Sequence, residues 1–151
     1  MKLQEYIKQE RFASTGHEAM LNIIVTASWV LSELNAVMAP HEITPAQYNV
    51  LRILRGSHPE TLTCTEIGNR LLDRTPDVTR LLNRLENSDL VFRSRAEHDR
   101  RIVNVGISEQ GLELLKRIDP AVQAQQEALM RSLLPDEHRQ LSDLLEKVRK
   151  G

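Results

Sequence analysis

Apolar residues recur at alternating steps of four and three near the start of the chain, a stripe typical of an amphipathic helix with a seam for another helix. The stripe comprises Met20, Ile24, Ala27, Leu31, Leu34 and Met38. Thr15 and Glu18 have the spacing of a capping box, and Pro40 disfavours helical geometry in the residue before it. The pattern therefore predicts one helix from about residue 15 to residue 39.

A second set of stripes lies near the C-terminus and begins after Ser108. A serine oxygen caps free backbone N–H groups, and the acid that follows it interacts favourably with the helix dipole. The positions predicted to face inward are Leu112, Leu115, Ile118, Val122, Leu129, Met130, Leu133 and Leu134, then Leu141, Leu144, Leu145 and Val148. Pro120 should kink or split the first of these helices, because proline removes a backbone hydrogen bond.

Three threonines between these ends stand where helices could begin. Two are followed three residues later by glutamine or glutamate, as in a capping box, and the third directly precedes a proline suited to the first helical position. The threonines are Thr44, Thr63 and Thr75. The helices that they predict span residues 45–56, 64–72 and 76–87. The last two, joined by a tight turn, form a helix-turn-helix pattern.

Two short β-type runs, "LVFRSR" and "RIVNVGI", follow the helix-turn-helix. Apolar and polar residues alternate in the second run, and the intervening "AEHDR" has the length of a hairpin loop. A hairpin directly after a helix-turn-helix is a wing. The predicted fold is therefore mainly α (α+β): a winged helix-turn-helix with long N- and C-terminal helices.

The totals narrow the class of protein. The chain has 151 residues, which suits one domain or one domain with an oligomerisation extension, and its single cysteine excludes an intramolecular disulfide. The net charge of −1 argues against a histone-like nucleic-acid binder but does not exclude a local basic face. The longest apolar candidate, "MLNIIVTASWVLSELNAVM", is interrupted by polar residues such as Asn22 and Glu33, so we expect no membrane span. The N-terminus lacks the apolar core of a signal peptide, and we expect a cytoplasmic protein.

Catalytic and metal motifs are absent from the sequence. No histidine pairs with another histidine, cysteine or carboxylate at a familiar ligand spacing, and the sequence has no phosphate-binding glycine loop and no nucleophile elbow. Cys64 opens a predicted helix, where a redox thiol and a plain structural thiol are both open readings. We therefore expect no enzyme, no cofactor and no metal.

Arginines between residues 70 and 101 carry the strongest functional signal. Residues 70–101 contain eight arginines and six acidic residues, which leaves a net charge of +2. One interpretation of this composition is a solvent-exposed surface with mixed charges that form salt bridges. The placement of the arginines favours DNA instead, because a recognition helix meets base edges with its first turns, and a narrow minor groove attracts inserted arginine. The residues so placed are Thr75, Pro76, Asp77, Thr79, Arg80 and Arg84 on the helix, and Arg95, Arg100 and Arg101 at the wing.

The segment "TPDVTRLLNRLENSDLVFRSRAEHDRRIVNVGISEQG" resembles the MarR family of bacterial transcriptional regulators. The resemblance rests on the "VTR" of the recognition helix, the "LNRLE" that follows, the "DRR" of the wing, the alternating valines and the "SEQG" helix start. In this chain Asp89 occupies the turn where the family often has glycine, and aspartate tolerates left-handed geometry better than most residues.

The resemblance implies a homodimer and a sequence-specific regulator, usually a repressor, bound to a pseudo-palindrome. Residues 1–39 and 108–151 would form the dimerisation part, and residues 40–107 the DNA-binding part. By position, Arg100 would enter the minor groove while Asp99 holds Arg101 or Arg80. Thr75, Asp77 and Arg80 would face the major groove, and Thr79 a phosphate.

The resemblance also implies release by a small, often aromatic and acidic, effector. Its pocket would lie between the dimer helices and the winged part. The residues expected to line it are His17, Trp29, Met38 and His41. A second reading stays open: a winged-helix module for protein–protein assembly, which predicts no salt-dependent DNA binding.

Overall fold

The computed structural model of the chain describes residues 2–74, 77–95 and 101–150. Its elements in chain order are α1 (Leu3–Ile7), α2 (Thr15–Met38), a 3₁₀ turn (Ala39–His41), α3 (Pro45–Ser57), β1 (Leu62–Thr63), α4 (Cys64–Arg70), α5 (Val78–Asn87), β2 (Val91–Arg95), β3 (Val103–Ile107), α6 (Glu109–Met130) and α7 (Pro135–Lys150). The predicted mainly α fold with a winged helix-turn-helix is confirmed.

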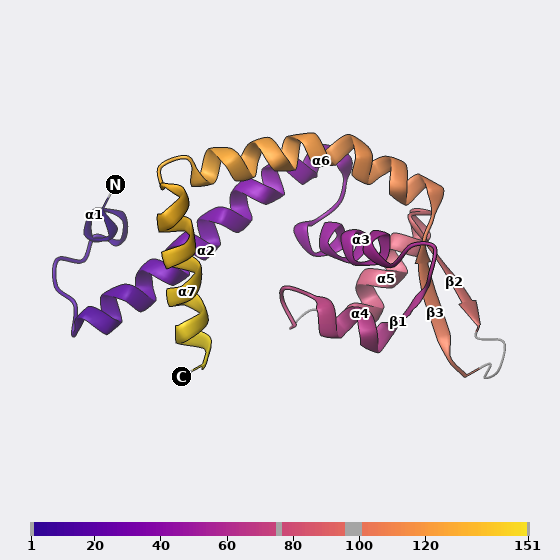
Figure 1. Cartoon of the computed structure of the whole chain (residues 1–151), viewed down its shortest axis with the longest axis horizontal. Coiled ribbons are helices and arrows are strands. Elements are labelled where there is room, and N and C mark those ends of the chain that lie inside the picture. The colour runs from indigo at the N-terminus through magenta and orange to yellow at the C-terminus, as the bar shows by residue number, and fades with distance from the viewer. Residues whose placement is uncertain (1, 75–76, 96–100, 151) are drawn as a thin grey trace.

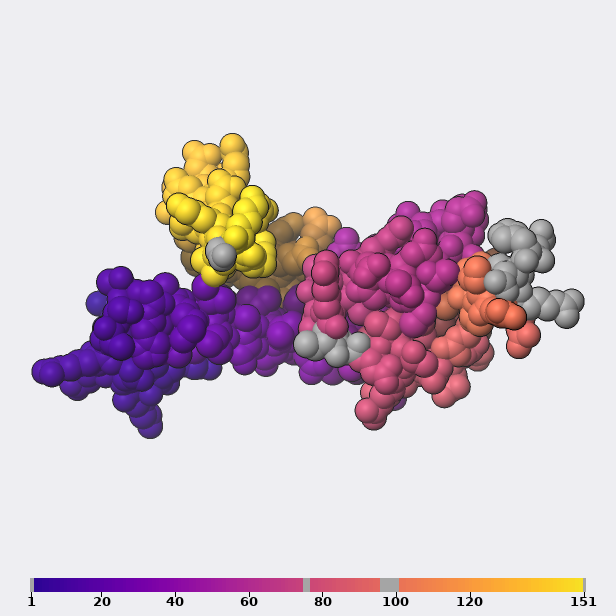
Figure 2. Space-filling model, turned by 90° about the horizontal axis from the view of Figure 1, so that it is seen from below, coloured from indigo at the N-terminus to yellow at the C-terminus, as the bar shows by residue number. Residues whose placement is uncertain are grey.

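Two regions lie side by side under one long helix (Figure 1). We call α3 through β3 (residues 45–107) the winged unit, and α2 and α7 the arms. Helix α6 leaves β3 at the winged unit, arches over α3 and continues along α2, and it contacts both helices. Seen from below, α7 and the first half of α2 lie at one end of the molecule and the winged unit at the other (Figure 2).

Local capping signals fix most helix starts. The Thr44–Gln47 and Thr63–Glu66 capping boxes form as predicted at α3 and α4, because each threonine oxygen accepts the backbone N–H that the first turn leaves free. Ser108 caps α6 by accepting from the N–H of Gly111 at 3.0 Å.

Two predicted helix starts are wrong. Ser14 rather than Thr15 caps α2, and its hydroxyl accepts from the N–H of His17 at 3.1 Å. Helix α5 begins at Val78 with Asp77 as its cap, two residues beyond the predicted start. In both places the structure uses the stronger cap, because serine and aspartate are preferred to threonine at this position.

Three antiparallel strands form the wing, in the order β1-β3-β2. The predicted hairpin pairs Val91 with Ile107 and Arg95 with Val103. Strand β1 was not predicted, and it pairs Leu62 with Val105. The wing is therefore tied through β1 directly to the start of α4.

The turn into the wing has the geometry expected for a glycine position. Asp89 has φ 56°, which confirms its predicted role at the end of the recognition helix. The hydroxyl of Ser108 donates to the Asp89 carbonyl at 2.6 Å. A Cβ on Gly111 would lie 2.3 Å from the Leu90 carbonyl oxygen, so α6 starts this close to the turn only because residue 111 is glycine.

The hydrophobic core sits in the winged unit and under the first half of α6. The fully buried side chains include Val50, Leu51, Leu54, Ile67, Leu82, Leu85, Val105, Leu115 and Ile118. Met38, the last residue of α2, is buried in the same cluster. The core therefore joins α3, α4, α5, the sheet, α6 and the end of α2 into one packed body.

The arms keep most of their apolar surface exposed within the single chain. Leu144 and Val148 of α7 are 62% and 65% exposed, although their spacing predicted inward positions. Leu31 of α2 is 56% exposed. These stripes are helical as predicted, but none of the described residues covers them.

One further expectation needs correction. Residues Thr15–His41 are long and apolar enough to cross a membrane by length and composition, with none of the most apolar stretch buried, whereas the sequence was expected to contain no such run. A long amphipathic helix with one uncovered apolar face passes the same test.

Pro120 was expected to kink or split the helix that follows the wing. It does not split α6, which continues from Glu109 to Met130 as a single arch (Figure 1).

Candidate nucleic-acid interface

Helix α5 presents one buried and one exposed face. Leu82 and Leu85 are buried in the core. The opposite face carries Thr79, Arg80, Asn83 and Arg84, all exposed. The exposed face is polar and rich in hydrogen-bond donors, which are the groups that read guanine edges and phosphates in DNA.

Asp77 is the N-terminal cap of α5. Its carboxylate accepts from the backbone N–H of Arg80 at 3.1 Å, so the residue caps α5. The cap fixes the direction in which the first turn of the helix leaves the preceding loop. The predicted residues Thr75 and Pro76, just before it, lie outside the described residues.

Thr79 lies on the side of α5 that faces α4. Its hydroxyl approaches the Cys64 thiol, with 3.9 Å between oxygen and sulfur. Both side chains line a small hollow of about 320 Å³ that Asn83, Arg93 and Val103 also border. Cys64 is only partly exposed there, between the two helices of the helix-turn-helix.

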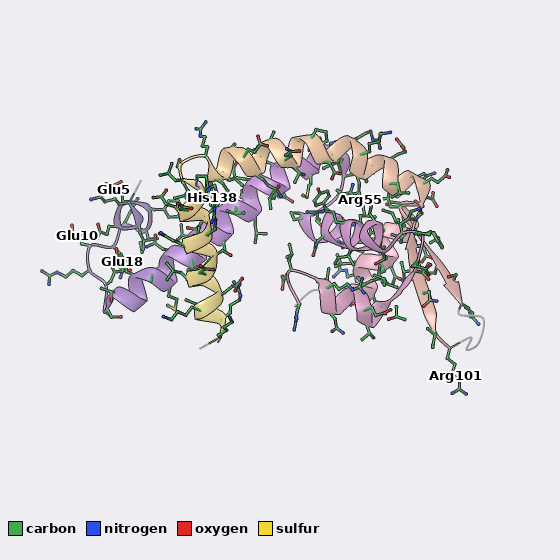
Figure 3. The ribbon with its side chains drawn as sticks, in the orientation of Figure 1. Glu5, Glu10, Glu18, Arg55, Arg101 and His138 are labelled. Atoms are coloured by element: carbon green, nitrogen blue, oxygen red, sulfur yellow. The ribbon has the colours of Figure 1, made fainter. Side chains whose placement is uncertain are left out.

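The wing carries its cations at its far end. Arg95 ends β2 opposite Val103, and its side chain is exposed. Arg101 extends away from the body just before β3 (Figure 3). Asp99 and Arg100 lie outside the residues that the structure describes, so their predicted division of roles stays a prediction.

Arg93 belongs to this region but was missed by the sequence analysis. From β2 its guanidinium donates to the Glu86 carboxylate and, at 2.7 Å, to Asn83 Oδ1, both on α5. This contact joins the wing to the recognition helix. The sequence contained a signal for the position of Arg93. In a strand, Arg93 lies on the same face as Val91, and the hydrophobic pattern predicts that this face packs toward the core.

Charge is distributed unevenly over the molecule. Arginines 80, 84, 95 and 101 occupy α5 and the wing, and Arg101 lies at the far tip (Figure 3). At the opposite end, Glu5, Glu10 and Glu18 are balanced by three cations, which are Lys2, Lys8 and Arg11. The balanced total therefore conceals a basic end, whereas the acids that offset it are not gathered at the start of α2.

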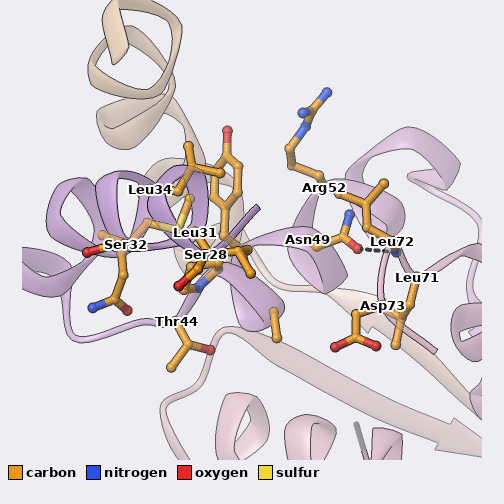
Figure 4. A pocket seen from close by; sticks show the side chains of 15 residues that line it. Ser28, Leu31, Ser32, Leu34, Thr44, Asn49, Arg52, Leu71, Leu72 and Asp73 are labelled. Carbon is orange, nitrogen blue, oxygen red and sulfur yellow. Dashed lines mark hydrogen bonds between the residues drawn. The ribbon is translucent and has the colours of Figure 1, made fainter. Parts of the chain in front are cut away.

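A cavity of about 570 Å³ lies between α2, α3 and the loop after α4 (Figure 4). Its wall is mostly apolar, with Leu31, Leu34, Met38 and Leu71 among the lining residues. Arg52 borders it from α3, and the N–H of Leu72 donates to Asn49 Oδ1 at 3.0 Å at its mouth. This size and lining suit a small organic molecule with an apolar body and a polar or anionic group.

Of the residues expected to line an effector pocket, Met38 borders this cavity. His17 lies at the start of α2, where its Nδ1 accepts from the N–H of Ala13 at 3.3 Å. Trp29 and His41 are not among the lining residues. Among the described residues no group of three or more histidine, cysteine or acidic side chains could hold a metal ion.

Tyr48 connects the cavity to α6. It lines the cavity from α3, and its hydroxyl donates to Asp119 Oδ1 at 2.9 Å. Burial, and then the hydrogen bond to the Asp119 carboxylate, raise the pKa of Tyr48 to about 12. Burial opposes ionisation of Asp119, but the hydrogen bonds from Arg55 and Tyr48 outweigh it and hold the pKa of Asp119 below its ordinary value.

Comparisons with known proteins agree with this geometry. A sequence model of the MarR family matches residues 41–102. The uncharacterized HTH-type transcriptional regulator YkoM of Bacillus subtilis is 32% identical over 108 residues, which cover 72% of this chain and 69% of that protein.

Two solved structures extend the likeness over nearly the whole chain. A MarR transcription factor from Planctomyces limnophilus is 35% identical, with a TM-score of 0.70, and the match covers 90% of this chain and 98% of the other. A mutant of MarR from E. coli in complex with operator DNA is 28% identical, with a TM-score of 0.74, and covers 83% and 89%.

The winged helix-turn-helix and its arginine-bearing face define a DNA-binding transcription regulator rather than an enzyme. The chain belongs to the MarR family. DNA is accordingly its macromolecular partner.

Proposed function

We propose that this regulator is a cytoplasmic, homodimeric repressor that binds a pseudo-palindromic operator. In this proposal residues 40–107 bind DNA, and residues 1–39 with 108–151 form the dimer. The observation that carries it is the exposed polar face of α5 beside a wing that ends in arginines. Two-fold symmetry would place the half-sites about one helical turn, roughly 34 Å, apart.

The uncovered apolar stripes of the arms support the dimer. Leucines 31, 141 and 144 and Val148 are exposed in the single chain, at helical spacings that form continuous seams. A soluble chain buries such stripes against another helix. A second copy supplies the same stripes, as a self-complementary two-fold interface requires.

We assign the DNA contacts as follows. Arg80, Thr75 and Pro76 face the major groove, Thr79 and Arg84 lie near phosphates, and Asp77 positions the start of the helix as its cap. At the wing Arg100 enters the minor groove, Asp99 and Arg101 hold it in position, and Arg95 contacts the backbone. The exposure of Thr79, Arg80, Arg84 and Arg95 supports this assignment.

The test is selection of bound fragments from random DNA, followed by titration of the selected operator at several salt concentrations. R80A and R100A should each weaken binding by about 5- to 150-fold and flatten the salt dependence, since each removes a cation from the DNA. R139A removes an arginine from the arm instead and should change neither quantity. Unaltered operator binding by both R80A and R100A would contradict the assignment.

We further propose that an aromatic carboxylate releases the operator by binding in the cavity beside Arg52. The apolar wall and the arginine at its edge support this chemistry. Among the described residues Arg52 makes no ion pair within 4.0 Å, and it lies 6.0 Å from the centre of the Tyr48 ring. Its guanidinium is therefore available to a carboxylate.

Benzoate and benzamide have nearly the same shape, but only benzoate carries a negative charge, so a comparison of the two tests whether the cavity binds an anion. Benzoate should raise the melting temperature and weaken operator binding, benzamide should do so less, and R52Q should remove the difference between them. R139Q, the same change on the arm, serves as the control. Equal responses to the two probes, or no response to either, would refute an anion site at Arg52.

A further inference from the structure

One acidic side chain receives both polar contacts that α3 makes with α6. Asp119 Oδ1 accepts from the Tyr48 hydroxyl at 2.9 Å, and Asp119 Oδ2 accepts from the guanidinium of Arg55. Tyr48 and Arg55 are seven residues apart, so they lie two turns apart on the same face of α3. Both carboxylate oxygens of Asp119 therefore accept hydrogen bonds from side chains of the same helix, α3 of the winged unit.

Asp119 sits where α6 changes neighbours. Ile118, just before it, is buried in the core that α6 shares with α3. Further along α6, the amide of Gln125 donates to Glu33 of α2 at 2.8 Å. Val122 is the last buried residue of α6 in that core, so the contact at Asp119 lies within one turn of the boundary between the half of α6 that carries the winged unit and the half that runs along the arm.

The helix is least constrained by its own backbone at this boundary. Pro120 has no N–H, so the carbonyl of Lys116 loses its usual partner four residues on. Such positions bend more readily than the rest of a helix. A contact to the residue next to Pro120 therefore restrains α6 where its own hydrogen bonds do so least.

The polar contact at Asp119 adds direction to the apolar packing beneath it. Leu115 and Ile118 are fully buried in a close-packed core, which holds the first half of α6 against the winged unit. The two charge-assisted hydrogen bonds at Asp119 require defined distances and angles. They therefore favour one direction of α6 at the point where Pro120 weakens the helix.

We propose that Asp119 is a positioning residue that, through Tyr48 and Arg55, fixes the angle of the winged unit against the dimer and so selects the spacing of the two DNA half-sites. The inference rests on the proposed dimeric, operator-binding function. Each recognition helix is joined by the core to its own α3 and to the first half of α6, so a change in the direction of α6 at Pro120 moves the two recognition helices relative to each other.

The variants Y48F and D119N test this proposal. Y48F removes only the hydroxyl and keeps the ring that lines the cavity and the Asp119–Arg55 ion pair. D119N keeps the shape of the side chain and removes its charge. The matched control is E113Q, because Glu113 pairs with Lys116 on the exposed side of the same helix, at 3.9 Å.

The readout is binding of each dimer to duplexes with identical half-sites whose separation is changed by one base pair in either direction. The wild type and E113Q should prefer one spacing by about tenfold or more, because one base pair both shifts and rotates a half-site. In Y48F and D119N the preference should fall to within about threefold, with the off-spacing duplexes gaining relative to the optimum.

A merely structural role predicts a different outcome. Loss of stability would lower the affinity for all three duplexes by one factor and leave their ratio unchanged, which would overturn the proposal. If D119N fails to form a dimer by light scattering, Y48F alone decides, and an unchanged ratio in Y48F overturns it. Absence of salt-dependent DNA binding by the wild type would instead refute the proposed function, and this inference with it.

Discussion

The winged unit and the arms use the same kinds of apolar residue in opposite ways. Leu54 of the winged unit is completely buried, whereas Leu144 of α7 is mostly exposed. Both residues occupy regular helical stripes. An apolar stripe therefore predicts a helix with one face to bury, but the stripe does not indicate whether the surface that covers this face belongs to the same chain.

The two regions should therefore lose stability by different routes. The winged unit should unfold in a reaction that does not depend on protein concentration, since its core is internal. The arms should depend on concentration, because stability that comes from a partner follows mass action. Variants in each region test whether stability depends on protein concentration in the arms but not in the winged unit.

The double variant L141D/L144D should have the largest effect. It places two charges on the seam of α7, and loss of two buried leucines at about 1.5–3 kcal/mol each should raise the dimer dissociation constant by roughly 10²- to 10⁴-fold. Sedimentation analysis measures it, and circular dichroism should show that the winged unit stays folded. E146Q, also on α7, is the control. A double variant that remains a dimer would place the interface elsewhere.

The variant L54A should cost about 2–5 kcal/mol of unfolding free energy, because it leaves a cavity in a fully buried site. Its melting temperature should fall by the same amount at low and high protein concentration. L144A, an identical change on the arm, should lower the melting temperature mainly at low concentration. If the two variants behave alike, the contrast between the regions is wrong.

Tyr48, at the junction of the two regions, should make stability depend on alkaline pH. Because its pKa is raised from 10.0 to about 12, folding favours the protonated phenol, so this contribution is present below pH 10 and is lost as the pH rises toward 12. Two pKa units correspond to at most about 2.7 kcal/mol. Y48F should lose less stability over this interval than the wild type.

Absorbance at 295 nm follows the ionisation of Tyr48 directly. The wild type should show a step near pH 12 that disappears in Y48F. A wild-type titration that is complete well below pH 12 would mean that the hydroxyl does not donate to Asp119.

The variant D89G should give the smallest effect, and it should stabilise the protein. Glycine removes the strain of φ 56° at the end of α5, with a gain of up to about 1 kcal/mol. S88G is the matched control, because Ser88 has φ −99° and glycine there should only destabilise. Chemical denaturation measures both. An equal loss in the two variants would show that Asp89 is not strained.

Where a structural signal is local, the sequence predicted it well. Thr44, Thr63 and Ser108 cap helices as expected because each acts on N–H groups within three residues. The errors at Ser14 and Asp77 arise where two candidate caps lie within two residues of each other and the stronger cap was passed over. Strand β1 was missed because two residues are too few to show an alternating pattern.

The site was predictable only in part, for a physical reason. The exposed face of α5 follows from helical periodicity, and Thr79, Arg80 and Arg84 lie on it as expected. The cavity joins α2, α3 and the loop after α4, residues 28–73, and its walls depend on how these elements pack. Contacts such as Tyr48–Asp119 link residues 71 positions apart, and no periodic pattern of apolar and polar residues predicts such a contact.

The order of elements along the chain has a consequence for synthesis. Helix α2 emerges from the ribosome before either of the helices that could cover its apolar face, since α6 begins at Glu109. At ordinary elongation rates of about 5–20 residues per second, this face would wait roughly 4–14 s for α6 and longer for a second chain. We therefore expect a nascent chain of this protein to expose the apolar face of α2 until its own α6 has been synthesised.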